Sequence, residues 1–177
     1  SGPLKEEDVC QPVNVYGQHK LEAEQRTLRN LPDSVGLRLT WMYDLPDSCL
    51  KQNSNLLANL QKASREGKTL QAAIHEFRGV TNVWEVVRNI DKALSLPGGI
   101  YNFGSGNNVN SYELFLAAAT LMKLREPSEW ILPDADRFSD QERNLTMNCA
   151  SIEAHGIQFN DSIEGIREAL QRPFRTK

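Results

Sequence analysis

The sequence contains few of the features that mark a metal-binding, disulfide-linked or membrane-spanning protein. Its three cysteines, Cys10, Cys49 and Cys149, are isolated and form no C-x-x-C pair, which argues against a disulfide framework and a zinc site. The three histidines are equally scattered, so we expect no metal site. No stretch approaches the roughly 18 apolar residues of a membrane helix, and we expect no membrane partner. Unpaired cysteines favour the reducing cytoplasm as the compartment.

A strong charge of one sign is also missing. Lys and Arg number 20 against 23 Asp and Glu, which leaves a net charge of -3 over 177 residues. With no run of Lys or Arg, we do not expect nucleic acid as a partner. Hydrophobic residues make up 40% of the chain and charged residues 24%, which is typical of a globular protein.

Helical and strand patterns alternate along the chain, and this alternation predicts an α/β fold. We expect helices over residues 13–29 and 55–65 and helices that start at Asn82, Asn110 and Asp161, each with a Glu three residues later as in a capping box. Strands are expected over residues 69–74 and 100–103. The apolar run 35–43 predicts a single parallel strand that is covered on both faces. The helix after Asn82 has one apolar face, formed by Val83, Val86, Val87, Ile90 and Leu94.

Tyr16 and Lys20 are the residues whose spacing suggests chemistry. Four residues apart on a helix, they share one face and can serve one site. A phenol is a poor acid–base group near neutral pH, but a neighbouring ammonium stabilises its phenolate form and so makes proton transfer easier. The same ammonium can donate to ribose hydroxyls. Tyr-x-x-x-Lys therefore suits proton transfer to a carbonyl oxygen while a nicotinamide handles the hydride.

Several segments together resemble the extended short-chain dehydrogenase/reductases, specifically the dTDP-4-dehydrorhamnose reductase family. The run LRLTWMY at 37–43 is similar to the family's Arg-Thr-Ser-Trp-Val-Tyr segment, and RNLTMN at 143–148 to its Arg-Pro-x-Asn-Ser-x-Leu segment without the proline. At 79–82, GVTN resembles the family's Gly-x-Pro-Thr turn, with Val80 in place of the proline. The other resembling segments, in family order, are GPLKEED (2–8), PVNVYG (12–17), KLEAE (20–24) and GIYNF (99–103) with the helix that follows it.

The resemblance implies a role for each matched residue. It makes Tyr16 the proton donor to the keto oxygen and Lys20 the residue that binds the nicotinamide ribose and favours the phenolate. Trp41 and Arg143 occupy positions where the family contacts the sugar nucleotide. The implied cofactor is NADPH or NADH, and the implied reaction is the reduction of a 4-keto sugar nucleotide, of the dTDP-4-dehydrorhamnose to dTDP-rhamnose type.

The resemblance also implies that the chain is the C-terminal part of a reductase. The family's Gly-rich phosphate-binding turn has no counterpart here, since Gly104-Ser105-Gly106 lacks the third glycine and lies late in the chain. We therefore expect the C-terminal portion of a Rossmann-type fold plus a smaller α/β substrate-binding domain. Residues 1–45 would end the nucleotide-binding domain, and 46–177 would be mainly substrate-binding region, with 80–104 returning a helix and strand to the main sheet.

Such a chain should be inactive alone, because it lacks the phosphate-binding turn. We also expect an N-terminal half or another chain to complete the sheet. A homodimer is compatible with the resemblance. Two other readings remain open. One is a non-catalytic subunit like the regulatory β subunit of methionine adenosyltransferase, which keeps Tyr-x-x-x-Lys, although Trp41 favours the reductase. The other is a sugar-nucleotide epimerase or dehydratase of the same superfamily, which recycles its cofactor.

Overall fold

The computed structural model describes residues 2–45 and 54–171, and Cys49 lies outside them. The elements follow one another in the order α1 (Val15–Asn30), β1 (Val35–Leu39), β2 (Trp41–Tyr43), α2 (Leu56–Arg65), β3 (Leu70–Ala73), β4 (Glu76–Phe77), β5 (Val80–Asn82), α3 (Val83–Ala93), β6 (Gly99–Phe103), α4 (Ser111–Leu121), the 3-10 helix η1 (Pro127–Glu129), β7 (Ile131–Asp134), β8 (Arg143–Asn144), α5 (Ala150–Glu153) and α6 (Ser162–Gln171). No helix among the described residues is long and apolar enough to span a bilayer.

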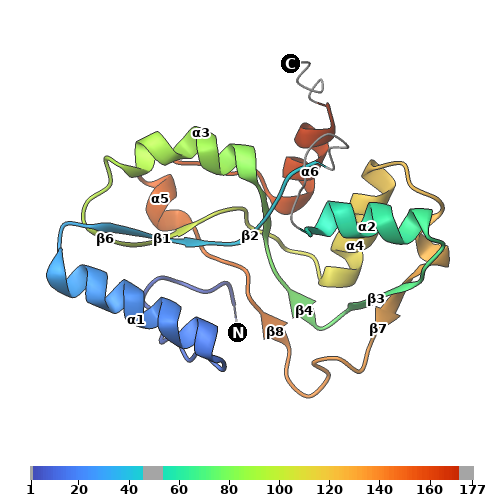
Figure 1. Cartoon of the computed structure of the whole chain (residues 1–177), viewed down its shortest axis with the longest axis horizontal. Coiled ribbons are helices and arrows are strands. Elements are labelled where there is room, and N and C mark those ends of the chain that lie inside the picture. The colour runs from blue at the N-terminus through green and yellow to red at the C-terminus, as the bar shows by residue number, and fades with distance from the viewer. Residues whose placement is uncertain (1, 46–53, 172–177) are drawn as a thin grey trace.

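The strands form four parallel pairs, which confirms the predicted α/β class. β1 pairs with β6, β2 with β5, β3 with β7, and β4 with β8. Figure 1 shows the β1–β6 pair between α3 and α1, and the β3–β7 pair beside α4. Parallel neighbours need a crossover connection, and the long gaps in sequence between the paired strands supply it.

Residues 35–43 form two strands instead of the single strand predicted from their apolar run. β1 follows β6 from Val35 to Leu39, and after Thr40 the chain joins β5 as β2. The Thr40 hydroxyl is hydrogen-bonded to the Thr81 hydroxyl at this crossing. Gly104 packs so closely there that an added Cβ would lie 2.8 Å from Thr40 Oγ1. The strand breaks because its two partners diverge, and the expected cover on both faces is incomplete, since Leu39 and Trp41 are exposed.

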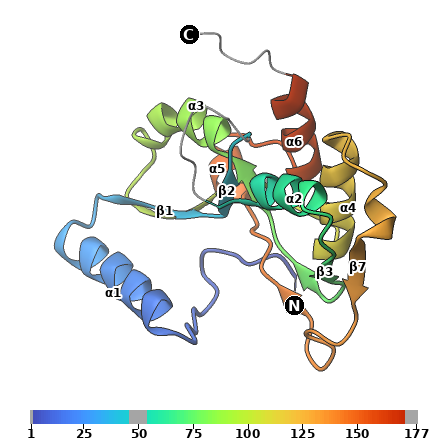
Figure 2. The ribbon, with the colours of Figure 1, turned by 45° about the vertical axis from the view of Figure 1, so that its right-hand side comes forward.

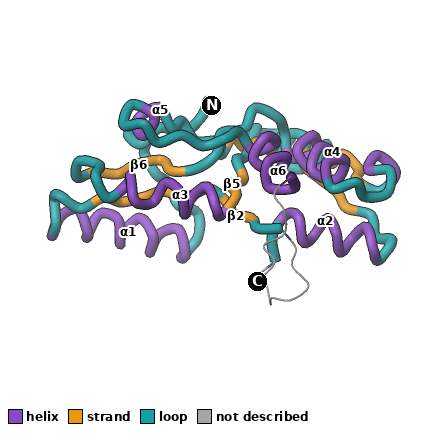
Figure 3. The backbone as a smooth tube through the Cα atoms, turned by 90° about the horizontal axis from the view of Figure 1, so that it is seen from above, coloured by secondary structure: helices purple, strands orange, loops and turns teal. Residues whose placement is uncertain are grey.

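The chain has two hydrophobic cores, and the elements that contribute most to them lie on different sides of the molecule: Figure 3 shows α3 and β6 on one side and α2 and α4 on the other. The smaller core joins α3, β6 and α5, and its buried residues are Ala93, Leu96, Tyr101, Phe103, Ile152 and Ile157. The larger core joins α2, α4, α6 and the β3–β7 pair, with Leu57, Leu60, Leu114, Trp130, Ile131 and Ile166 among its fully buried members. The separate cores divide the described chain into two packed regions.

The buried face of α3 differs from the predicted one. Val87, Ile90 and Leu94 are exposed, whereas Glu85, Asn89 and Ala93 are buried. The polar members of this face have partners: Glu85 Oε2 accepts from the Asn160 backbone N–H at 3.0 Å, and Asn89 Nδ2 donates to the Gln158 carbonyl at 2.9 Å. Buried polar side chains are tolerated here because they form hydrogen bonds with a distant segment. The pattern of apolar residues along the helix cannot predict such hydrogen bonds.

α1 projects from the rest of the molecule and has no buried residue (Figure 2). A paired contact holds it to β1: Arg38 Nε donates to Glu24 Oε2 at 2.9 Å and Nη2 to Oε1 at 2.8 Å. The hydrogen bond that Arg38 donates to the Glu24 carboxylate raises the pKa of Arg38, although burial alone would lower it. Arg38 therefore stays charged and connects the helix to the strand.

Candidate functional site

Tyr16 and Lys20 lie on one face of α1, in its first two turns. The helix starts here because Asn14 Oδ1 accepts the Gly17 backbone N–H at 2.8 Å, which caps the N-terminus. Lys20 Nζ lies 5.5 Å from the centroid of the Tyr16 ring, and Tyr16 is 72% exposed. Within the described part of the chain, Lys20 forms no salt bridge, so its ammonium is available to a ligand.

These two side chains border a hollow of about 830 Å³ between α1 and β1. Val35, Leu37 and Leu39 of β1 give this hollow apolar lining, and Tyr16, Lys20 and the Arg38–Glu24 pair give it polar lining. A phenol, an ammonium and an apolar wall are groups that fit a ribose and a planar ring. Tyr16 and Lys20 are thus the residues that could hold a cofactor at this hollow.

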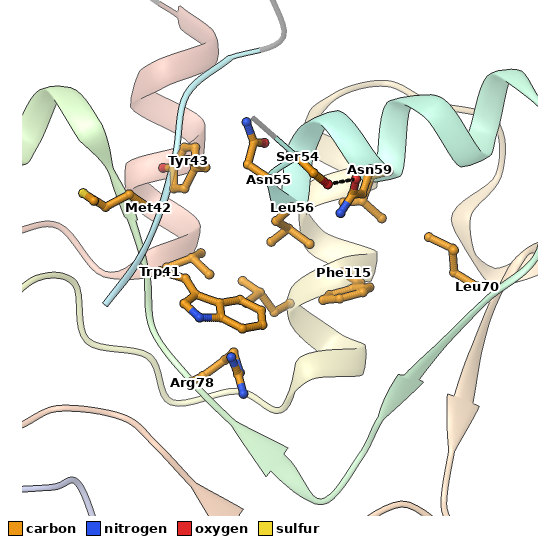
Figure 4. A pocket seen from close by; sticks show the side chains of 13 residues that line it. Trp41, Met42, Tyr43, Ser54, Asn55, Leu56, Asn59, Leu70, Arg78 and Phe115 are labelled. Atoms are coloured by element: carbon orange, nitrogen blue, oxygen red, sulfur yellow. Dashed lines mark hydrogen bonds between the residues drawn. The ribbon is translucent and has the colours of Figure 1, made fainter. Parts of the chain in front are cut away.

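Trp41 lies at a second hollow, of about 490 Å³, enclosed by β2, α2 and α4. Figure 4 shows its indole above Arg78 and facing the aliphatic and aromatic side chains of Leu56 and Phe115. The Arg78 Cζ atom lies 3.8 Å from the centroid of the indole, within cation–π range. Trp41 is 67% exposed, so the other parts of the ring remain open to a ligand.

Arg78 connects Trp41 to Arg143 through a nearly buried carboxylate. Arg78 Nη2 lies 2.7 Å from Glu76 Oε1, and Arg143 Nη1 lies 3.3 Å from the same oxygen. Glu76 and Arg143 are register partners in the β4–β8 pair, which explains how residues so far apart in sequence meet. Ser111 Oγ donates to Glu76 Oε2 at 3.1 Å. Within this cluster two guanidinium groups face one carboxylate, so one positive charge is left over that can pair with an anionic group of a ligand.

Sequence reasoning missed Arg78. Arg78 comes just after β4, two residues from Glu76, and such spacing is common and carries no signal alone. The structure adds that Arg78 Nε is buried and has no hydrogen-bond partner among the described residues. A guanidinium with an unused donor beside an apolar hollow is a candidate ligand-binding group.

The structure places the four predicted site residues at three hollows. Tyr16 and Lys20 border the first and Trp41 the second. Arg143 borders a third, of about 510 Å³, which is also lined by the carboxylates of Asp136, Asp140 and Glu142. Leu39 and Trp41, only two residues apart, line the first and second hollows respectively, so the segment 35–43 runs between the two sites.

Comparison with known proteins identifies similar chains. The model of the family described as RmlD substrate binding domain matches residues 1–173. "Methionine adenosyltransferase 2 subunit beta" of Danio rerio is 26% identical over 178 residues, which cover 95% of this chain and 54% of the relative. The chain thus spans about half the length of the curated relatives it matches.

Solved structures show the same fold at low sequence identity. The dTDP-4-dehydrorhamnose reductase of Bacillus anthracis, in complex with NADP, has a TM-score of 0.74 at 16% identity over 93% of this chain and 57% of that one. The dTDP-glucose 4,6-dehydratase of the same organism, in complex with NAD, has a TM-score of 0.71 at 19% identity over 97% and 55%. The chain therefore has the Rossmann-like α/β fold of these structures, and it covers only part of them.

Proposed function

Because the chain belongs to the RmlD substrate binding domain family, we propose that its parent protein reduces the keto group of a sugar nucleotide with a nicotinamide cofactor. The dTDP-4-dehydrorhamnose to dTDP-rhamnose type is the specific reaction proposed, with NADPH, or alternatively NADH, as the cofactor. The observation that carries the proposal is Trp41 stacked on Arg78 at the 490 Å³ hollow. An indole face for the sugar or base and a guanidinium for the diphosphate meet the needs of a sugar nucleotide.

Tyr16 and Lys20 are proposed as the catalytic pair. When bound at the first hollow, the nicotinamide would supply the hydride that adds to the keto carbon. The Tyr16 hydroxyl gives its proton to the keto oxygen, so that the C=O bond becomes an alcohol and the phenol becomes a phenolate. Lys20, 5.5 Å from the ring, stabilises that phenolate and donates to the ribose hydroxyls. Trp41, Arg78 and Arg143 hold the sugar nucleotide.

Replacing Tyr16 by Phe in the parent protein tests this proposal. NADPH oxidation with a 4-keto sugar nucleotide should fall by a factor of at least about 100, because the proton donor is lost, while NADPH binding stays near wild type. Tyr112→Phe is the matched control, since this half-buried tyrosine belongs to the larger core on α4. An unchanged rate for Tyr16→Phe would refute the role of Tyr16.

We also propose that another segment of the parent protein, or another chain, pairs with the second edge of β1. Within the described residues β1 pairs only with β6, and an open edge invites a further strand. In this arrangement residues 1–45 and 80–104 belong to the nucleotide-binding part, and the rest of 46–177 to the substrate-binding region. Amide hydrogen exchange along β1 can be measured in the parent protein and in this chain alone. The β1 amides should exchange more slowly in the parent protein, because only there does a further strand bind their open edge.

A second candidate function is a binding subunit without reductase activity. The observation in its favour is the similarity to the β subunit of methionine adenosyltransferase 2 from Danio rerio. A parent protein that binds NADPH and associates with a methionine adenosyltransferase catalytic subunit, but oxidises no NADPH with any 4-keto sugar nucleotide, would support it. An epimerase or dehydratase would convert a sugar nucleotide without net consumption of NADPH.

A further inference from the structure

Phe138 has a backbone conformation that is unfavourable for its residue type. It lies in the loop between β7 and β8 with a φ of 64°, in the left-handed region where a glycine or asparagine is usual and a bulky residue is an outlier. Short hydrogen-bonded turns flank it: the Arg137 N–H donates to Asp134 Oδ1 at 3.0 Å, and the Ser139 N–H to the Asp136 carbonyl at 3.2 Å. Strained residues often lie at sites where the side chain has a task.

The ring of Phe138 contacts the guanidinium of Arg143. The Arg143 Cζ atom lies 5.1 Å from the ring centroid, while Nη1 of the same guanidinium lies 3.3 Å from Glu76 Oε1. Arg143 is thus held between an aromatic ring and a carboxylate. Arg78 has the same arrangement at the same oxygen of Glu76, with Trp41 as its ring. The five side chains form one row, aromatic–cation–carboxylate–cation–aromatic, that links the second and third hollows.

We propose that Phe138 is a positioning residue, which holds Arg143 beside Glu76 so that Arg143 and Arg78 act on the same anionic group of the ligand. This inference rests on the proposed function, in which the ligand is a sugar nucleotide. Arg143 has a long, flexible side chain that is 42% exposed, so without the ring its guanidinium would be free to turn into solvent. Arg78 needs no such aid, because its side chain is only 12% exposed.

Replacing Phe138 by Gly separates the function of the ring from the stability of the loop. Glycine adopts this φ without strain, so the melting temperature should stay the same or rise. Calorimetric titration of the parent protein with inorganic pyrophosphate, and with thymidine diphosphate, should show binding weakened by about two- to fivefold, the range of an exposed cation–π contact. Phe138→Tyr keeps the ring and should bind as wild type.

Arg143→Gln tests whether Phe138 acts through Arg143. In that background, adding Phe138→Gly should cause no further loss, because the guanidinium that the ring orients is gone. Arg137→Gln is the matched control: Arg137 lies equally close to the ring, at 5.1 Å, but makes no contact with Glu76 in the described chain, so binding at physiological salt should be unchanged.

The outcomes separate the inference from the proposed function. If Arg143→Gln weakens binding but Phe138→Gly does not, the inference is overturned and the proposed function stands. Further weakening by Phe138→Gly on the Arg143→Gln background would also overturn it, since the ring would then act elsewhere. If the wild-type parent protein binds neither pyrophosphate nor thymidine diphosphate, the proposed sugar-nucleotide site is refuted and the inference falls with it.

Discussion

Replacing Arg38 by Met should release α1 from β1 and leave the two cores folded. α1 contributes no buried residue, so the paired contact between Arg38 and Glu24 is the strongest link between the helix and the strand. Both side chains are largely shielded, at 23% and 20% exposure, which limits competition from water. The Tyr16–Lys20 pair is on this helix, so its position depends on the same link.

The magnitude follows from the geometry. A hydrogen bond to a charged group contributes about 1.5–3 kcal/mol to stability. Arg38 and Glu24 form two such bonds, but removing both charged groups from water offsets part of the gain. We take about 1.5–3 kcal/mol for the pair. Because roughly 1.4 kcal/mol corresponds to a tenfold change in an equilibrium constant, the population with α1 detached from β1 should rise about 10- to 100-fold. Glu24 raises the pKa of Arg38, so the ion pair stabilises the fold at every pH below the usual pKa of arginine. This stabilisation is lost only when the pH rises through the pKa of Arg38 in the folded protein. The effect should not vary with pH near neutrality.

Amide hydrogen exchange resolves this local event. Exchange in α1 should accelerate by that factor in Arg38→Met, while α4, in the larger core, keeps its protection. Glu22→Gln is the matched control on the same helix: its pair with Arg26 has side chains 69% and 53% exposed, and such surface pairs contribute little. Unchanged exchange in α1, or equal acceleration in both variants, would show that other contacts hold the helix.

Two further substitutions and one labelling experiment test a helix cap and two buried side chains. Asn110→Ala removes the capping box in which Asn110 and Glu113 bond each other's backbone, and should lower the free energy of unfolding in urea by about 1 kcal/mol; a loss below a few tenths would contradict the assignment. Burial raises the pKa of Cys149 to about 11, so iodoacetamide near neutral pH should modify exposed Cys10 first, and mass spectrometry showing equal rates would oppose this. Tyr43→Phe should leave stability unchanged or raise it by up to about 1 kcal/mol, because this buried hydroxyl has no hydrogen-bond partner among the described residues; a clear loss in a thermal melt would disprove it.

Local sequence patterns were sufficient for most helices and for the α/β class. The helix predicted over 13–29 is observed as Val15–Asn30, and the capping box predicted at Asn110 is present. Both depend on residues three or four apart, whose geometry a helix sets by itself. The Tyr16–Lys20 spacing is of the same kind: the sequence placed both residues on one face, and the structure adds only the hollow beside them.

The tertiary structure decided what depends on partners distant in sequence. The break at Thr40 comes from two strands that diverge, and the polar buried face of α3 comes from hydrogen bonds to the segment before α6. The row of side chains through Glu76 joins residues of β2, β4, β8, the turn after β4 and the loop between β7 and β8. These segments lie far apart in the sequence, so no local pattern could indicate the row. Sequence alone determines the short-range geometry of this chain, because helical periodicity and capping act within one turn. Which polar groups meet, and which hollows they border, follows only from the packing of strands that lie far apart along the chain.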